Sequence, residues 1–154
     1  MPTPRDAGRL LAAARPRDRL GALAQLRGPR EFALFARMTA FAATVPWLMR
    51  LPLARVDALV TRPVGRRADD VERLPVLAAL APRLAHPLVR TGCLTRGITL
   101  YWFLRRAGLD VELRFGVDPA TADGHCWLAL EDEPYLERVD PRPRFSETYR
   151  LPAA

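Results

Sequence analysis

The sequence predicts an α+β fold, in which N-terminal helices and a central helix that carries a cysteine pack on a small antiparallel sheet. Apolar residues recur every three or four positions through 31–60, 70–84 and 94–107, which is typical of helices with a buried face. Apolar and polar residues alternate through 111–117, which is typical of a strand, and shorter strand-like segments follow. Because the helices come first and the strands follow, one helix packed on a three-stranded meander is the simplest arrangement.

We divide the chain into an Arg-rich N-terminal arm, residues 1–30, a helical region, residues 31–87, and a region that carries the candidate chemistry, residues 88–154. The last two are expected to form one compact domain, since 154 residues suffice for a single modest core. The arm is expected to be weakly helical, and its acidic residues argue against an organelle transit peptide. Proline and glycine predict a linker at 61–70.

The helical region is expected to form core helices rather than a membrane span. Its uncharged run from Met38 to Met49 is bounded by arginines and is shorter than the roughly 20 residues that a spanning helix needs. Pro46 interrupts this run, so we expect a break there and a second helical piece after it. An amphipathic helix that lies on a membrane surface or binds a partner is the alternative.

The central helix is expected over 94–107, because this segment is apolar around most of its circumference. Two arginines in its last turn suit the negative end of the helix dipole, and Gly108 predicts a left-handed stop. Strands are expected at 111–117, 125–130 and 135–140, with turns between them.

Composition argues against several classes of function. The 24 basic residues, all arginine, outnumber the 17 acidic ones, and the resulting net charge of +7 favours an anionic partner. No helix-turn-helix, zinc or aromatic RNA-binding motif accompanies this charge, so nucleic acid is not expected. Two cysteines and two histidines lack the spacing of a structural zinc site, and neither a metal nor another cofactor is expected. No secretory signal is evident, so we interpret both cysteines as reduced and expect the protein to be cytoplasmic.

Two short segments near the C-terminus carry the candidate chemistry. Cys93 follows Gly92 at the start of the central helix, where unpaired backbone N–H groups and the helix dipole favour a thiolate. His125 begins the strand-like segment 125–130 after a loop, from where it can face the helix start. A thiol and an imidazole so placed predict a nucleophile and its base for acyl transfer. Taken alone, Cys93 is more simply interpreted as a buried structural cysteine, and His125 as a surface histidine.

An acid that orients His125 is predicted in the next segment, at Asp140 or Glu137. With a hairpin turn at 132–133, Asp140 lies opposite His125. With the turn at 131–132, neither acid lies opposite, and a bulge is needed to bring Glu137 into place. We favour Asp140 because it stands at the end of the predicted strand, and both acids also fit surface positions without a role.

The other residues of these types receive smaller roles. Cys126 is expected on the strand face opposite to His125 and is interpreted as a small core residue. His86, in a proline-rich turn, is given no role. The backbone N–H of Cys93 is one candidate donor to an oxyanion, and the sequence identifies no second donor.

These segments resemble the transglutaminase-like (papain-like) superfamily. In particular they resemble the leader-peptidase B proteins of lasso peptide biosynthesis, of the microcin-processing C-terminal domain type. The resemblance covers residues 88–142. It rests on Gly92-Cys93-Leu94 at the start of an apolar helix, on the segment 104–117, and on His125-Cys126-Trp127-Leu128 followed by an acid.

The resemblance implies a Cys–His–acid triad that includes Cys93 and His125. Glu137 falls near the acid of the B proteins on an ungapped match. The segment Val139-Asp140-Pro141 matches the one that supplies the acid in broader transglutaminase-like domains, so the third member stays open.

The resemblance further implies a bacterial, cytoplasmic cysteine protease that removes the leader from a ribosomally made precursor peptide. A separate leader-recognition protein and a cyclase would act with it. Three alternatives remain: another acyl transfer by the same triad, a non-catalytic scaffold that binds a peptide or protein, and a nucleic-acid binder driven by charge.

Overall fold

The computed structural model describes residues 26, 28–61, 71–84, 89 and 92–153. The N-terminal arm up to residue 25, nearly all of the predicted linker and His86 lie outside these residues. Within the described residues, four α-helices, a short 3₁₀ helix and four strands confirm the predicted α+β fold. These elements are α3 (Pro29–Leu48), α4 (Leu53–Val60), η1 (Val71–Arg73), α5 (Leu74–Leu84), α6 (Cys93–Arg106), β1 (Val111–Val117), β2 (Gly124–Leu130), β3 (Glu133–Tyr135) and β4 (Ser146–Leu151).

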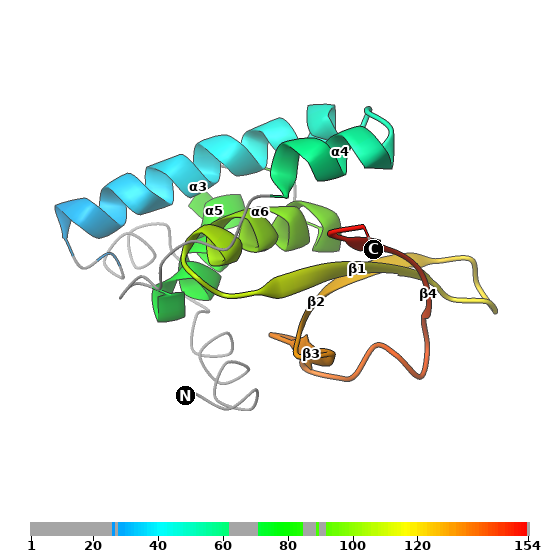
Figure 1. Ribbon diagram of the computed structural model, residues 1–154. Helices are drawn as coiled ribbons and strands as arrows, with labels where there is room; N and C mark the ends of the chain where they lie inside the picture. The colour runs from blue at the N-terminus through cyan, green and yellow to red at the C-terminus, as the bar shows by residue number, and fades with distance from the viewer. Residues whose placement is uncertain (1–25, 27, 62–70, 85–88, 90–91, 154) are drawn as a thin grey trace.

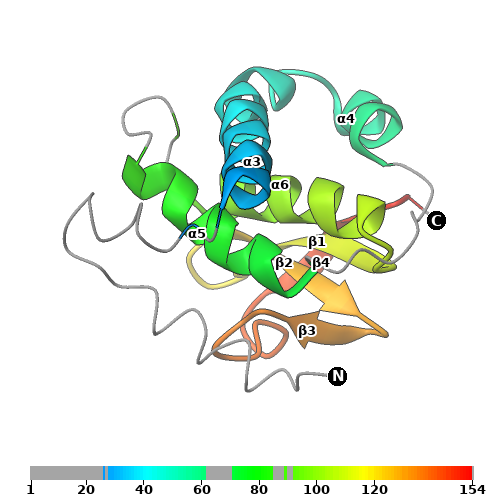
Figure 2. The same cartoon turned by 90° about the vertical axis from the view of Figure 1, so that its left-hand side faces the viewer.

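The helices cover one face of the sheet (Figures 1 and 2). α6 lies directly on β1 and β2, while α3 and α5 pack on α6. The apolar core lies between these layers, so α6 is the central helix that the sequence predicts. Fully or almost fully buried members of this core are Met38, Leu77, Ile98, Leu104, Leu113 and Leu128.

α3 continues through Pro46, so the break predicted there is wrong. Pro46 lies in the last turn of α3. Proline has no backbone N–H to donate, so one helical hydrogen bond is missing, but only near the helix end. The chain turns instead after Leu48, where the N–H groups of Arg50 and Leu51 make short-range hydrogen bonds that tighten the end, and α4 begins after Pro52. No helix within the described residues is long and apolar enough to cross a membrane.

α6 has almost the predicted bounds, and Gly108 ends it as predicted. Gly108 has a left-handed backbone with φ 90, and its N–H donates to the carbonyl of Arg105 at 3.1 Å. The N–H of Leu109 donates to the carbonyl of Leu104 at 3.0 Å, which completes a Schellman motif. This tight ending sends the chain directly into β1, so the helix folds back on the sheet.

The sheet has the order β3-β2-β1-β4, and each neighbouring pair of strands is antiparallel. β1 has the predicted bounds, and β2 begins one residue earlier than predicted. The predicted third strand at 135–140 is wrong, because β3 ends at Tyr135 and the left-handed backbone of Leu136 (φ 64) turns the chain away. β4 pairs with the other edge of β1 and adds a fourth strand to the predicted meander.

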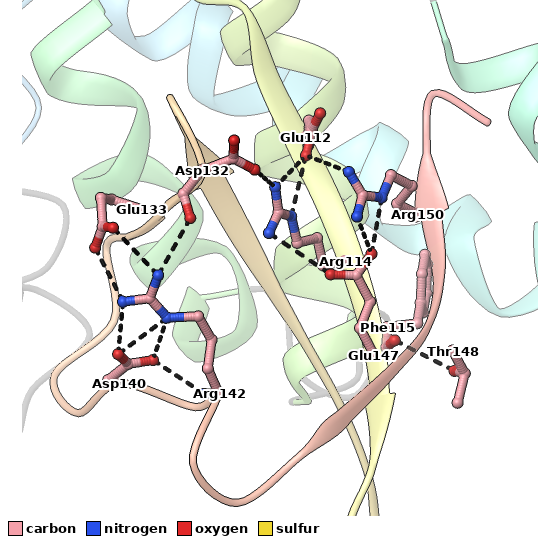
Figure 3. Close-up of polar contacts among 10 residues, drawn as sticks. All are labelled: Glu112, Arg114, Phe115, Asp132, Glu133, Asp140, Arg142, Glu147, Thr148 and Arg150. Carbon is pink, nitrogen blue, oxygen red and sulfur yellow. Dashed lines mark hydrogen bonds and ion pairs between the residues drawn. The ribbon is translucent and has the colours of Figure 1, made fainter. Parts of the chain in front are cut away.

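A two-residue turn, Glu131-Asp132, joins β2 to β3 and sets their register. Both residues have left-handed φ, 52 and 65, as a tight hairpin turn requires. The buried side chain of Arg114 in β1 binds Asp132 and also donates to Glu112 at 2.6 Å, which ties the turn to the sheet (Figure 3). The register that would set Asp140 opposite the histidine of β2 is therefore not the one adopted.

Candidate active site

Cys93 is the first residue of α6, and its side chain is exposed. Gly92 precedes it, and a Cβ built at Gly92 would meet nothing within 4 Å, so space is open at the residue before the thiol. The first turn of a helix has unpaired N–H groups and the positive end of the dipole, which favour a negative charge. Cys93 thus lies where the sequence predicts it, at a helix start that a substrate can approach.

The thiol of Cys93 lies at an open edge of β2. β3 pairs only with residues 128–130, so no strand among the described residues covers the first half of β2 on that side. Hydrogen-bonding directions alternate along a strand, and the N–H of Cys126 points to this open edge and donates to the sulfur of Cys93. Adjacent strand residues point to opposite faces, so His125 and Cys126 approach the sulfur from the two sides of the sheet.

These neighbours lower the pKa of the Cys93 thiol from the ordinary 9.0 to about 5. The hydrogen bond from the Cys126 thiol contributes most, and partial burial opposes it. The backbone N–H of Cys126, a hydrogen bond from His125 and the positive charge of the imidazolium lower the pKa further. Cys93 is therefore a thiolate at neutral pH, which is the form that acts as a nucleophile.

Cys126 is buried beneath the first two turns of α6. Its sulfur lies 3.1 Å from the position that a Cβ would take at Gly97, four residues after Cys93 on the same helix. The hydrogen bond to Cys93 and then burial raise the pKa of Cys126, so this residue keeps its proton while Cys93 carries the charge. The predicted core position agrees with the 4% exposure of Cys126, but its contact with Cys93 was missed. Gly97, a glycine inside an apolar helix, is the signal in the sequence that a neighbour approaches closely there.

His125 contacts two aromatic rings on the sheet face that points away from α6. Its ring lies 4.9 Å from that of Phe145 and stacks on that of Trp127 at 6.2 Å, measured between ring centroids. Its Nε2 lies 3.9 Å from Oε2 of Glu137. The imidazole thus has the Cys93 thiol on one side and a carboxylate on the other.

Glu137 reaches His125 because the chain turns at Leu136. The side chain of Leu136 is buried, and its carbonyl accepts a hydrogen bond from Nη2 of Arg96 at 3.0 Å. Arg96 follows Cys93 by three residues in α6, so the helix that carries the thiol also holds the segment that carries the acid. Burial raises the pKa of Glu137, while Arg96 and His125 act in the opposite direction.

Asp140 lines the same groove as His125 and Glu137, but its carboxylate binds Arg142 (Figure 3). Nε of Arg142 lies 3.0 Å from each carboxylate oxygen of Asp140, and the guanidinium also reaches Glu133 of β3 at 3.0 Å. Arg142 holds the pKa of Asp140 below its usual range. Among the described residues no hydrogen bond or ion pair joins Asp140 to His125, because the chain leaves the sheet at Leu136 before the predicted pairing can form.

Two adjoining hollows surround the cluster. A small pocket of about 40 Å³ is lined by both cysteines, His125 and Glu137, together with Arg96 and Tyr135. A larger groove of about 610 Å³ shares Arg96, His125 and Glu137 with it and continues past Val139, Arg144 and Phe145. The groove therefore adjoins the small pocket that the thiol of Cys93 lines.

A family model described as the transglutaminase-like superfamily matches residues 34–150. The chain belongs to this superfamily. No curated protein and no solved structure matches the chain. The match spans both the helical region and the sheet, so the transglutaminase-like domain includes most of α3 and not only the segments around Cys93 and His125.

Transglutaminase-like proteins are commonly cysteine peptidases or acyltransferases, and both reactions proceed through a cysteine thiolate. Within the described residues, no group of three or more His, Cys, Asp and Glu side chains is placed to hold a metal ion. The reactive groups that the arrangement brings together are the thiol of Cys93, the imidazole of His125 and the carboxylate of Glu137.

Proposed function

We propose that this transglutaminase-like protein is a cysteine peptidase that cleaves the leader from a ribosomally made precursor peptide. The observation that carries the proposal is the meeting of Cys93, His125 and Glu137 at the open edge of β2, with a lowered pKa at the thiol. The resemblance of the segments around Cys93 and His125 to leader-peptidase B proteins supplies the substrate class.

In this proposal the thiolate of Cys93 attacks the carbonyl carbon of the scissile peptide bond. The backbone N–H of Cys93, at the helix start, stabilises the oxyanion of the tetrahedral intermediate. Imidazolium His125 gives its proton to the leaving amine, which leaves an acyl-enzyme on Cys93. Neutral His125 then takes a proton from water, whose oxygen attacks the acyl carbon and releases the second product.

Glu137 acts in this scheme by orienting the imidazole and stabilising its protonated form. It faces Nε2 of His125, so Nδ1 is the nitrogen left to exchange a proton with the sulfur. The pKa of Glu137 is raised by burial, but the nearby positive charges of Arg96 and His125 favour its ionised form. Asp140, already held by Arg142, is given a structural role.

The groove beside the thiol is the proposed binding place of the leader. Val139 and Phe145 offer it apolar contacts, and Arg138 and Arg144 offer it positive charge. A separate recognition protein that delivers the leader, and a cyclase that uses the released core peptide, complete the proposed system. The proposal of these two partners rests on the family resemblance.

The test is cleavage of a precursor peptide encoded beside the gene of this protein, or of a library of defined peptides, followed by mass spectrometry. We expect two fragments that add up to the substrate plus one water, and no fragments with Cys93→Ala. Glu137→Gln is expected to lower the cleavage rate by between about 10- and 10³-fold, whereas the matched variant Asp140→Asn leaves it nearly unchanged.

The same assay separates the competing functions. A product in which an added amine replaces water would assign an acyltransferase that uses the same triad. Cleavage that persists in Cys93→Ala would overturn the proposed nucleophile. Binding of a peptide without any reaction, together with a Cys93 thiol that alkylates only slowly, would assign a non-catalytic scaffold.

A further inference from the structure

The chain has two cysteines, and both lie in the candidate active site. The mechanism uses the exposed one, Cys93, as its nucleophile, and it needs only a hydrogen bond from the other. The side chain of Cys126 lines the same small pocket as Cys93, and the two thiols are hydrogen-bonded to each other. A second sulfur in contact with a reactive thiolate has a chemistry of its own.

The packing of α6 on β2 holds these two sulfurs together. Gly97 leaves a gap in the helix face one turn after Cys93, and the Cys126 sulfur fills it, 3.1 Å from where a Cβ would stand. Leu113 of β1 closes the same gap, with Cδ1 3.0 Å from that position. Because Gly97, Leu113 and Cys126 are buried, the Cys126 sulfur has little room to move away from the helix start.

We propose that Cys93 and Cys126 form a reversible disulfide when a hydroperoxide oxidises the active-site thiolate. A regulatory effect of this disulfide on peptide cleavage rests on the proposed function. In the first step the Cys93 sulfur attacks the terminal peroxide oxygen, the O–O bond breaks, and hydroxide or an alkoxide leaves and takes up a proton. The sulfur is oxidised by two electrons to a sulfenic acid, and the peroxide is reduced to water or an alcohol.

In the second step the Cys126 sulfur attacks the Cys93 sulfur. The S–O bond of the sulfenic acid breaks, the S–S bond forms, and the proton of the Cys126 thiol leaves with the hydroxyl group as water. A thiol reductant reverses this by exchange and returns both cysteines to their reduced form.

The electrostatics of the pair suit this order of events. The chief cause that keeps Cys126 protonated is its contact with Cys93, and the negative charge of the Cys93 thiolate adds to it. Oxidation of Cys93 to a neutral sulfenic acid removes that charge, so the Cys126 thiol then loses its proton more easily. Burial meanwhile shields Cys126 from direct oxidation, and the exposed thiolate reacts first.

The expected consequence is that Cys93 is protected from irreversible oxidation. A sulfenic acid without a neighbouring thiol proceeds to the sulfinic and sulfonic acids, which thiol reductants do not restore. With Cys126 in place, the oxidised enzyme is stopped as a disulfide that blocks the nucleophile until a reductant returns it.

The experiment treats the full-length wild-type protein and Cys126→Ser with hydrogen peroxide, blocks the remaining thiols with iodoacetamide and maps the peptides by mass spectrometry. Serine keeps a hydroxyl donor beside the Cys93 sulfur but cannot form a disulfide, so it is a matched control. We expect a linked peptide pair that contains both cysteines in the wild type. Dithiothreitol is expected to restore at least about tenfold more free Cys93 thiol in the wild type than in Cys126→Ser, where Cys93 gains two or three oxygens.

Wild-type Cys93 that accumulates sulfinic acid to the same extent as in Cys126→Ser, with no linked peptide, would overturn the proposal. The wild-type peptide map decides this even if the variant does not fold. The readout counts thiols and does not depend on cleavage, so a disulfide without peptidase activity would refute only the proposed function. Cleavage without a disulfide would refute only this inference.

Discussion

Replacement of Cys126 by alanine is expected to raise the pKa of the Cys93 thiol by at least about one unit, a tenfold change in thiolate below the midpoint. Four contributions from Cys126 and His125 together lower that pKa from 9.0 to about 5, while burial opposes them. The hydrogen bond from the Cys126 thiol is the largest of these causes, so its removal is the single change expected to raise that pKa most. Cys126→Ser keeps a hydroxyl donor and is expected to stay closer to the wild type.

The assay is the rate of alkylation of Cys93 by iodoacetamide between pH 4 and 9, with the product assigned by peptide mass. The quantity to compare is the midpoint of the pH profile. A thiol of lower pKa has a larger thiolate fraction, but its thiolate is intrinsically less nucleophilic, so the two effects partly cancel in the absolute rate. For the wild type we expect a midpoint near 5. His125→Ala is expected to raise it as well, since the imidazole contributes both a hydrogen bond and a charge.

Two results would refute this reasoning. A wild-type midpoint near that of free cysteine, about 8.5, would mean that no donor stabilises the thiolate. A Cys126→Ala profile that coincides with the wild type, while His125→Ala differs, would mean that the imidazole alone activates the thiol and that the contact between the two cysteines has no electrostatic effect.

Three further variants test the surroundings of the thiol. Arg96→Leu is expected to slow peptide cleavage by between about 10- and 10²-fold without moving the alkylation midpoint. The variant releases the Leu136 carbonyl but removes no donor to the Cys93 sulfur. Slower cleavage together with a shifted alkylation midpoint would contradict this. Gly116→Ala is expected to lower the free energy of unfolding by about 1–3 kcal/mol in denaturant titrations. Its Cβ would lie 2.9 Å from an indole carbon and 3.0 Å from a carbonyl oxygen, whereas that of the control Gly124→Ala meets nothing within 4 Å. The wild type is expected to gain thermal stability relative to Cys93→Ser as pH rises from about 5 towards 9, since the pKa of Cys93 is lower in the folded than in the unfolded chain. A difference in thermal stability that does not change with pH would exclude that linkage.

Local patterns predicted the elements whose causes are local. The apolar circumference of α6, its glycine stop at Gly108 and the alternation of β1 are each contained in a few neighbouring residues, and both elements have nearly the expected bounds. β4 lacks such a pattern, because its first three residues are exposed and it is held by pairing with β1 across a long stretch of chain. The end of α3 also differs, since a proline in a last turn disturbs little.

The contact between the two cysteines depends on a register that the sequence does not display. The alternation of strand residues correctly puts His125 and Cys126 on opposite faces of the sheet. On that ground alone, only one of the two side chains is expected to contact Cys93. What brings both to the sulfur is the short β3, which leaves the edge of β2 open at the level of Cys126. The length of a neighbouring strand therefore decides which side chains meet the nucleophile.

The choice between Glu137 and Asp140 follows from a single backbone conformation. Extrapolating a hairpin register assumes that the strand continues, but Leu136 adopts a left-handed φ of 64, which is unfavourable for a residue with a side chain. Two gains offset that cost: the leucine side chain is buried at 2% exposure, and Arg96 binds its carbonyl. Both partners come from outside the hairpin, so counting residues within it leads to Asp140, whereas tertiary contacts turn the chain and bring Glu137 to the imidazole.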